Sequence, residues 1–321
     1  MRYVLIIFCF LTISKSNTTI GSAFIPLEKT EIYSIVEYII IENKSSDLHI
    51  LNQPYTLAQI ESLLANKDDL LEYLLSEVPH LYKGSNKLVL SPIIGMGSIF
   101  SEKFKKNYPI VSYTLNFNND NIFLLTDLNI DEKYKLDNNF HGNKNLWPTG
   151  YIHNAYFQYR TNSSSFFLGR QSRNWGILNE YSLIFSNNPY SFDHIGFTTS
   201  FGKIKFSYYT SKLADLNALD LDGVSIPEGE YALSQRYWSA HRIDYIISKK
   251  IQVSLSEAVT YGGPNSNFEF TYLNPTYFYL VGQKNDQLEA NNFIQLSALY
   301  SYSPKITYFL DLLIDDIIVN N

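Results

Sequence analysis

The chain has 321 residues, of which 45% are apolar, so it can bury a sizeable core. Only 17% of its residues are charged, against about a quarter in ordinary soluble domains, while aromatic residues reach 16%. The formal net charge is −6 and the chain has no basic run, a balance that argues against binding to nucleic-acid phosphates.

Residues 1–23 have the features of a secretory signal peptide. Arg2 supplies the positive start, residues 3–13 form an apolar run, and small residues at 21–23 suit cleavage. The run is too short for a transmembrane helix, which needs about twenty apolar residues. The single cysteine, Cys9, lies inside it, so the exported chain would have no thiol for a disulfide and would carry a formal net charge of −8.

Residues 24–87 are predicted to form a small helical segment. Its first helix has one apolar face, made of Ile32, Ile35, Val36 and Ile39. Thr56 and Gln59 have the spacing of a capping box, and a third helical pattern follows over 68–78. The polar faces are acidic as well as basic, which argues against helices that lie on a membrane surface.

From residue 88 onward, apolar residues recur at every second position, which predicts β-strands over the region 88–321. About eleven strands are expected, near 88–99, 110–118, 121–129, 151–161, 164–170, 195–201, 203–211, 231–248, 251–261, 290–302 and 306–316.

The connections between these strands alternate in length. Tight turns have the sequences NND, NSS, FGK, SKK and SPK. The links between them are long and cover 100–109, 130–150, 171–194, 212–230 and 262–289. Greek-key links of a soluble sandwich have no reason to alternate in this way, whereas outer-membrane barrels combine short periplasmic turns with long extracellular loops.

The faces of the strands agree with an antiparallel outer-membrane β-barrel. In the last strand Leu310, Leu312 and Ile314 alternate with Asp311 and Asp315. The aliphatic side chains would face lipid and the carboxylates the lumen, since a charge on the lipid side at mid-bilayer costs about 2–4 kcal/mol for Arg or Lys and less for Asp. Aromatic residues near strand ends suit the headgroup layers: Tyr108, Tyr151, Trp238, Tyr261, Tyr272, Tyr300 and Tyr302.

Four motifs, in this order, resemble the Wzi family of capsule assembly proteins: FFLGRQSRNWGILNEYSLIFSNNPYSFDHI, AHRIDYIISKKIQVSLSEAVTYGG, FEFTYLNPTYF and LLIDD. The resemblance covers roughly 150–316, and the stretch IYSIVEYIIIENK…NQPYTLAQIESLL is similar to the helical segment before the barrel in many members. It implies an outer-membrane barrel with a periplasmic helical segment, which acts as a surface lectin for capsular polysaccharide.

The barrels of this family resemble an eighteen-stranded cylinder that continues past the LIDD strand. An unclosed sheet in lipid would leave backbone N–H and C=O groups unpaired. Each such group costs several kcal/mol. With about eleven strands expected, the chain is predicted to be a C-terminally incomplete barrel, either a truncated product or fragment, or one that closes by associating with other chains.

Six charged residues are expected to point into the lumen: Arg160, Arg170, Arg236, Arg242, Asp311 and Asp315. They could form a polar channel or a saccharide site, or an interior network of ion pairs that braces an occluded barrel. Glu257 lies on the same side of its strand as Leu255 and fits the alternation only near an interface or after a bulge.

A saccharide site is expected in the long link 171–194, because aromatic faces and amide or carboxylate groups occur together there. The candidate residues are Trp175, Asn179, Glu180, Tyr181, Asn188 and Tyr190. The same residues could instead form an interfacial aromatic belt with loop-capping side chains.

The chain has no catalytic motif, metal-spaced cluster or phosphate loop, and no cofactor is expected. Adjacent Asp315 and Asp316 would face opposite sides of a strand, so they cannot flank one glycosidic bond. The sequence predicts a non-enzymatic outer-membrane protein that attaches or helps assemble capsular or exopolysaccharide. The alternatives are a porin-like diffusion channel and a surface-motility or secretion component; the sugar and the oligomeric state stay open.

Overall fold

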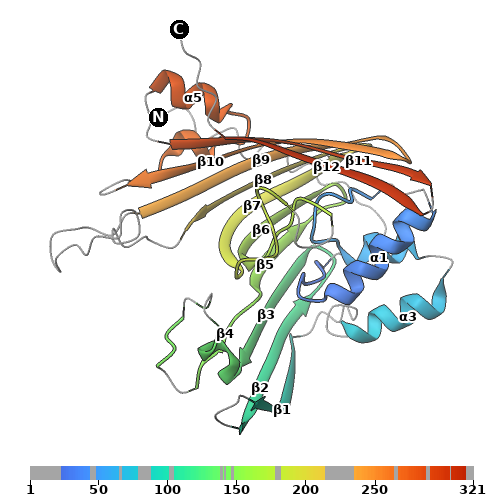
Figure 1. Ribbon diagram of the computed structural model, residues 1–321, viewed down its shortest axis with the longest axis vertical. Helices are drawn as coiled ribbons and strands as arrows, with labels where there is room; N and C mark the ends of the chain where they lie inside the picture. Colours follow the sequence, from blue (N-terminus) through green and yellow to red (C-terminus); the bar gives the residue numbers. More distant parts are fainter. Residues whose placement is uncertain are drawn as a thin grey trace.

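The computed structural model describes residues 23–43, 48–64, 67–78, 88–100, 105–137, 140, 142–145, 148–177, 182–213, 235–263, 267–286, 290–303 and 305–315. Most of these residues belong to one antiparallel sheet that curves into an open trough, with helices on both of its sides (Figure 1). We call the inner side of the trough the concave face and the other side the outer face.

The sheet has twelve strands: β1 (Leu88–Phe100), β2 (Lys105–Asn118), β3 (Ile122–Ile130), β4 (Gly150–Tyr151), β5 (Ala155–Arg160), β6 (Ser164–Gln171), β7 (Phe192–Phe201), β8 (Ile204–Lys212), β9 (Gln235–Ser248), β10 (Ile251–Gly263), β11 (Ala290–Ser303) and β12 (Ile306–Asp315). Successive strands are neighbours in the sheet, except that the two-residue β4 pairs only with β3. Within the described residues β1 pairs only with β2 and β12 only with β11, so the described sheet has two edges. The expected mainly β, antiparallel architecture is confirmed.

Most strands agree with the predicted ranges to within three residues, residues 231–234 of one predicted strand lie outside the described residues, and two strands differ more. The predicted strand 151–161 is divided into β4 and β5, because the backbone amide of Asn154 donates to Asp127 Oδ1 at 2.7 Å and interrupts the ladder. β2 begins at Lys105 rather than near residue 110, since its pairing with β1 continues as far as Phe100 through polar residues.

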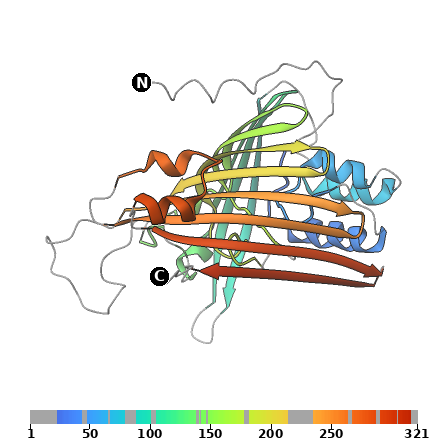
Figure 2. The same ribbon diagram turned by 90° about the horizontal axis from the view of Figure 1, so that it is seen from above.

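Tight turns and long links lie at opposite ends of the trough (Figure 2). The turns at 119–121, 161–163, 202–203, 249–250 and 304–305 join strand pairs at one end. The other end has the longer links 131–149, 172–191, 213–234 and 264–289, together with the short link 101–104. The predicted alternation of connection lengths is therefore present, apart from this shortened first link.

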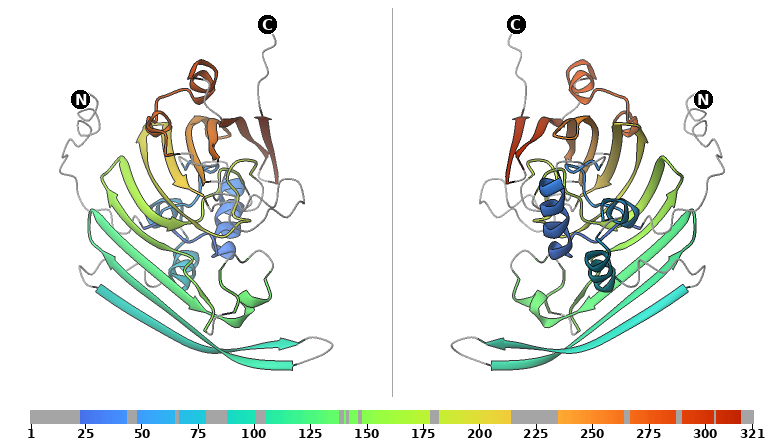
Figure 3. Two further views of the ribbon diagram at one scale, coloured as in Figure 1. Left: turned by 90° about the vertical axis from the view of Figure 1, so that its left-hand side faces the viewer. Right: turned by 90° about the vertical axis from the view of Figure 1, so that its right-hand side faces the viewer.

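Three helices lie inside the trough, toward the tight-turn end: α1 (Thr30–Asn43), α2 (Leu57–Leu63) and α3 (Asp68–Glu77) (Figure 3). The predicted capping box begins α2, where Gln59 N donates to Thr56 Oγ1 and Thr56 N donates to Gln59 Oε1. The apolar sides of the helices share one hydrophobic core with the concave face, including Phe123 and Phe167. The helical segment is thus packed into the sheet.

The two faces of the sheet differ in polarity. On the outer face Leu255, Leu296 and Leu312 lie side by side on β10, β11 and β12, and each is about half exposed. On the concave face the neighbouring Ser254 and Ser297 are buried. This arrangement agrees with the alternation expected from the sequence.

Part of the outer face is covered at the long-link end. The covering segment, residues 267–283, contains the short helix η3 (Phe270–Leu273) and the start of α5 (Tyr279–Asp286), which lie on the opposite side of the sheet from α1 (Figures 1 and 3). We call it the outer flap. Glu257 lies beneath it and its carboxylate accepts Leu280 N at 2.8 Å, so its place on the apolar side requires no bulge.

The predicted aromatic belt is only partly present. Tyr300 and Tyr302 are exposed on the outer face at the tight-turn end, where Tyr300 stacks on Tyr308. Four of the other residues predicted for the belt are buried: Tyr108, Trp238, Tyr261 and Tyr272. Trp238 packs on the concave side, Tyr261 lies under the outer flap, and Tyr272 is a flap residue whose side chain is buried against Tyr261, because the long links fold back onto both faces.

Candidate functional site

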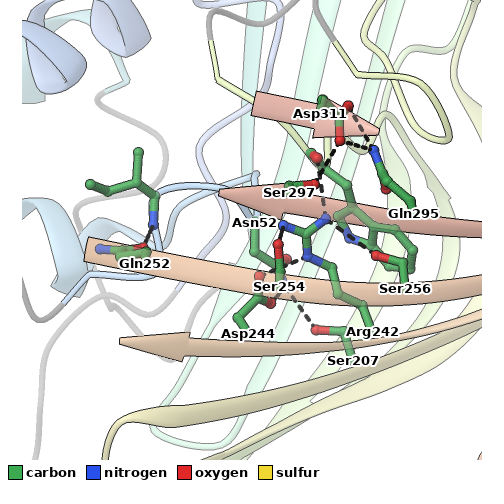
Figure 4. A network of polar contacts seen from close by, with 12 residues as sticks. Asn52, Ser207, Arg242, Asp244, Gln252, Ser254, Ser256, Gln295, Ser297 and Asp311 are labelled. Carbon is green, nitrogen blue, oxygen red and sulfur yellow. Dashed lines mark hydrogen bonds and ion pairs between the residues drawn. The ribbon is translucent and has the colours of Figure 1, made fainter. Parts of the chain in front are cut away.

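The centre of the concave face is a hydrogen-bonded network around Arg242 on β9 (Figure 4). The guanidinium is fully buried and donates from Nε to Asp244 Oδ1 at 2.7 Å and from Nη2 to Ser254 Oγ at 2.6 Å. Nη1 donates to the carbonyl of Trp175 at 3.2 Å. Arg242 and Asp244 share one face because they are two residues apart on a strand, so the buried charge finds its counter-ion on its own element.

The helical segment is tied to this network by two amide side chains. Asn52 Nδ2 donates to Asp244 Oδ2 at 2.7 Å and to Ser207 Oγ at 3.0 Å. Gln252 of β10 accepts from Ile50 N and donates to the carbonyl of Leu48. The loop between α1 and α2 therefore lies directly on the buried polar side chains of β8, β9 and β10.

The long link 172–191 folds into the trough and meets the same loop. Gln53 N donates to the carbonyl of Asn174 at 2.9 Å, and Asn174 Nδ2 donates to Gln53 Oε1 at 3.1 Å. The next residue, Trp175, is fully buried against Phe185 and under the Arg242 guanidinium. Segments from opposite ends of the trough are joined here, and the Trp175 ring has no free face for a sugar.

A second polar cluster surrounds Asp311 on β12. Its carboxylate accepts both from Gln295 Nε2 and from Ser297 Oγ at 2.8 Å, and also from the backbone N–H of Leu183 at 3.2 Å. Link 172–191 is thereby attached to β12 as well as to β9. Asp315, on the same side of β12, is exposed near the end of the strand.

The other residues predicted to point into the lumen do not lie together in the structure. Arg160 is buried on the concave face, where it donates to Asn118 Oδ1 and to the carbonyl of Asn119. Arg236 lies on the concave side of β9 at the long-link end. Arg170 does not belong to the lumen set: its strand position is on the outer face, where Nη2 contacts Asp193 at 2.6 Å, because β6 turns Gln171 and not Arg170 inward.

Sequence reasoning missed Arg173, which is buried beside the Arg242 network. Its guanidinium lies over three rings, those of Phe24, Phe167 and Tyr209, at 4.4–4.9 Å. Nε donates to His194 Nε2 at 3.0 Å, so that nitrogen must be unprotonated while Nδ1 donates to the carbonyl of Phe192. The arginine lies in a motif quoted above, but no neighbouring charge in the sequence indicated its aromatic setting.

Of the six candidate saccharide residues, Asn188 and Tyr190 remain accessible at the long-link end: Asn188 is exposed and Tyr190 is half-buried. The ring of Tyr190 lies 4.7 Å from that of Tyr151, and its hydroxyl donates to Asp137. Asn179, Glu180 and Tyr181 lie outside the described residues.

Tyr190 belongs to an aromatic cluster in the link between β3 and β5, with Tyr134, Phe140, Tyr151 and His153. The hydroxyl of Tyr134 is 2.8 Å from His153 Nε2. Burial lowers the pKa of His153, so the ring is neutral near pH 7 and its tautomer is set by these contacts.

The loop that reaches the Arg242 network also contains a buried titratable group, His49. Burial, reinforced by the charge of Lys205, lowers the pKa of His49 from its usual 6.5 to about 4. The unfolded chain therefore binds this proton at a higher pH than the folded chain does. Stability from His49 is fully present above pH 6.5 and is lost as the pH falls toward 4, by up to about 3 kcal/mol.

We expect the free energy of unfolding of the wild-type protein to fall between pH 7.5 and pH 4.5, and His49→Gln to make that fall smaller; the partly buried His153, whose pKa burial also lowers, contributes to the fall that remains. Urea unfolding at the two pH values, with the variant measured beside the wild type, checks this. An equal fall in both proteins would show that His49 does not titrate in this range.

The described part of the chain contains no group of three or more His, Cys, Asp or Glu residues placed to hold a metal ion. Within the same residues, no helix has both the length and the apolar character needed to cross a membrane.

These features together define a class of protein: a two-faced antiparallel sheet, with tight turns at one end and long links at the other, whose polar concave face is packed with protein. Residues 118–309 match the model of the family described as Capsule assembly protein Wzi, and the chain belongs to this family. The match runs from the end of β2 into β12 and includes Trp175 and Arg242, and it ends two residues before Asp311. A search of curated proteins finds no match to the chain.

Proposed function

We propose that the protein resides in the bacterial outer membrane and attaches or helps assemble capsular or exopolysaccharide at the cell surface without catalysing a reaction. The observation that carries this proposal is the family match over residues 118–309, since the family is one of capsule assembly. Export by the signal peptide 1–23 would bring the chain to that membrane.

The two faces of the sheet support an outer-membrane location. Strands β9, β10 and β11 have 13–14 residues each, which exceeds the about 9–11 that a tilted strand needs to span a bilayer. Their outer face presents apolar side chains, while their polar residues are buried on the other side. In this placement the tight turns and helices α1–α3 are periplasmic and the long links face outward.

The packing of the concave face favours an attachment role over a diffusion channel. Helices and link 172–191 fill the part of the trough around Arg242, and they satisfy its charge with protein groups instead of water. A channel would instead give steady conductance when the protein is reconstituted in planar bilayers, and we expect none.

The experiment that tests the function is deletion of the gene in its own bacterium. We expect polymer to be made in normal amounts but to be released into the medium, and cell-bound polysaccharide to recover on complementation. A drop in total polymer, or unchanged retention, would contradict an attachment role. A motility defect with normal capsule would favour the surface-motility alternative.

Within this function, Asn188 and Tyr190 are the accessible residues among the described saccharide candidates. We expect Asn188→Ala and Tyr190→Ala to weaken binding of the purified polysaccharide several-fold, because each removes one amide or ring contact. Lys249→Ala, at a tight turn on the other end of the sheet, is the matched control and should leave binding unchanged. Equal binding by all three variants would place the saccharide site elsewhere.

A further inference from the structure

The outer flap, residues 267–283, is held on the outer face by two hydrogen bonds from different strands. Tyr208 of β8 donates its hydroxyl to the carbonyl of Tyr272 at 3.2 Å. Glu257 of β10 accepts Leu280 N at 2.8 Å, and its other carboxylate oxygen is 3.1 Å from His241 Nε2. The flap is thus fixed to the sheet near both of its short helices.

The flap covers the part of the outer face that is polar. His241 and Glu257 lie on the same side of their strands as the exposed Ile243 and Leu255, and each is two residues farther toward the long-link end. Hydrocarbon contact at His241 and Glu257 would leave two polar side chains unsolvated. The flap shields these two polar positions and, farther toward the long-link end, packs on Tyr237, Val259 and Tyr261 of the same face.

The exposed residues of the flap include three large apolar side chains beside the polar Asn274 and Thr276. Phe270 is 81% exposed, Phe278 is 70% exposed and Val281 is 54% exposed. Large apolar side chains grouped in this way on a water-facing loop would be unfavourable, whereas aromatic residues are common where a membrane protein meets the headgroup layer. The flap therefore extends the exposed apolar surface of the sheet toward the long-link end.

A groove of about 250 Å³ adjoins the flap, with Phe268 on one side and Leu168 and Ile195 on the other. Lys212 also lines it, as does Asp193, whose carboxylate is paired with Arg170. The groove lies on the outer face, because Leu168 and Ile195 point outward from β6 and β7. An apolar groove beside a basic side chain suits an amphiphile with an acyl chain and an anionic headgroup.

We propose that the outer flap is a lipid contact, in which Phe270, Phe278 and Val281 enter the headgroup and upper acyl layer of the leaflet at the long-link end. The proposal rests on the membrane location proposed above. It assigns the flap a partner of one chemistry, membrane lipid, and it makes Glu257 a positioning residue that holds the flap on the sheet.

The test measures the depth of single fluorescent labels in lipid vesicles. The exported chain would contain no cysteine, so Phe278→Cys, Leu310→Cys and Leu183→Cys each give one labelling site for an environment-sensitive dye. Leu310 lies in the apolar band of the sheet, and Leu183 is an equally exposed leucine of link 172–191, away from the flap. Vesicles contain lipids with a spin-label quencher at a shallow or at a deep acyl position.

We expect the label at 278 to be quenched several-fold more by the shallow than by the deep spin label, the label at 310 to be quenched by the deep one, and the label at 183 by neither. A label at 278 that behaves like the one at 183 would overturn the lipid contact. If the lipid spin labels quench neither the dye at 278 nor the dye at 310, the proposed membrane location is overturned instead. Self-quenching between dyes at 278, without lipid quenching, would indicate contact with a second copy and also overturn the proposal.

Two substitutions of Glu257 test the positioning role. Glu257→Gln keeps an oxygen for Leu280 N, so shallow quenching at 278 should persist. Glu257→Leu removes the acceptor but preserves an apolar outer face, so quenching at 278 should fall several-fold while quenching at 310 is retained, which also shows that the sheet is still folded. Unchanged quenching at 278 in Glu257→Leu would show that Glu257 does not hold the flap.

Discussion

Replacing Arg242 by leucine is expected to lower the free energy of unfolding by about 3–5 kcal/mol, the largest effect of any single substitution proposed for this protein. The side chain is fully buried, and its removal takes the paired guanidinium from the buried Asp244, which keeps the amide of Asn52 and the neighbouring Lys205 of β8. The carbonyl of Trp175 and two serine hydroxyls also lose their donor. Unfolding in urea, followed by the gel shift of folded barrels, measures the change.

Two control variants distinguish the stability cost of losing a buried charge from the cost of losing any charge. Arg170→Leu removes a partly exposed guanidinium that is paired with Asp193 on the outer face, and it should cost less than about 1 kcal/mol. The double variant with Arg242→Leu and Asp244→Leu should recover part of the lost stability, because Asp244 no longer remains without its guanidinium; the recovery is incomplete because the buried Lys205 then loses the carboxylate that faces it. Equal costs for Arg242→Leu and Arg170→Leu would contradict the role given to the network.

The second large effect is expected on the outer face, at Leu296. This leucine lies at the middle of β11 between Leu255 and Leu312 and is 46% exposed. If hydrocarbon surrounds it, Leu296→Arg should lower the stability in lipid vesicles by about 2–4 kcal/mol. If water surrounds it, the same substitution on an exposed strand position should change stability by about 0.5 kcal/mol or less.

Leu296→Ala is the matched control, since it removes a similar side chain without adding a charge. The difference between the arginine and alanine variants isolates the cost of placing a charge in lipid. Arginine and alanine variants of equal stability in vesicles would contradict lipid contact at this position.

The strand pattern was predictable because one alternation controls the whole sheet. Where outward side chains are apolar and inward ones polar, as in β10 from Ile251 to Ser256, the alternation alone determines which residues face which side. The capping box at Thr56 was predictable for the same reason, because the signal is local. Register and strand order then followed from turns of two or three residues.

The sites were harder to predict, because they depend on contacts between distant segments. Trp175 had the composition of a sugar platform, yet link 172–191 turns it under Arg242, which is 67 residues away in sequence. The counter-ion of Arg242 is Asp244 rather than any aspartate of the last strand. Arg170 was assigned to the lumen from its charge, although the parity of β6 places it outside.

The long links also carry information that periodicity does not contain. The buried state of Tyr261 and of Glu257 is caused by the outer flap, a segment with no strand pattern of its own. The boundary between the helical segment and the sheet is readable in the sequence as a change of period near residue 88, whereas their shared core, with Phe24 against Phe167, is a tertiary feature.

The central claim is that hydrocarbon surrounds the apolar outer face of this sheet while protein fills the other side. Sedimentation of the exported chain, expressed in a bacterium and prepared without detergent, tests it most directly. We expect the chain to sediment with outer-membrane fragments and to enter solution only when detergent is added. A compact monomer that stays in the periplasmic extract without detergent would contradict the claim.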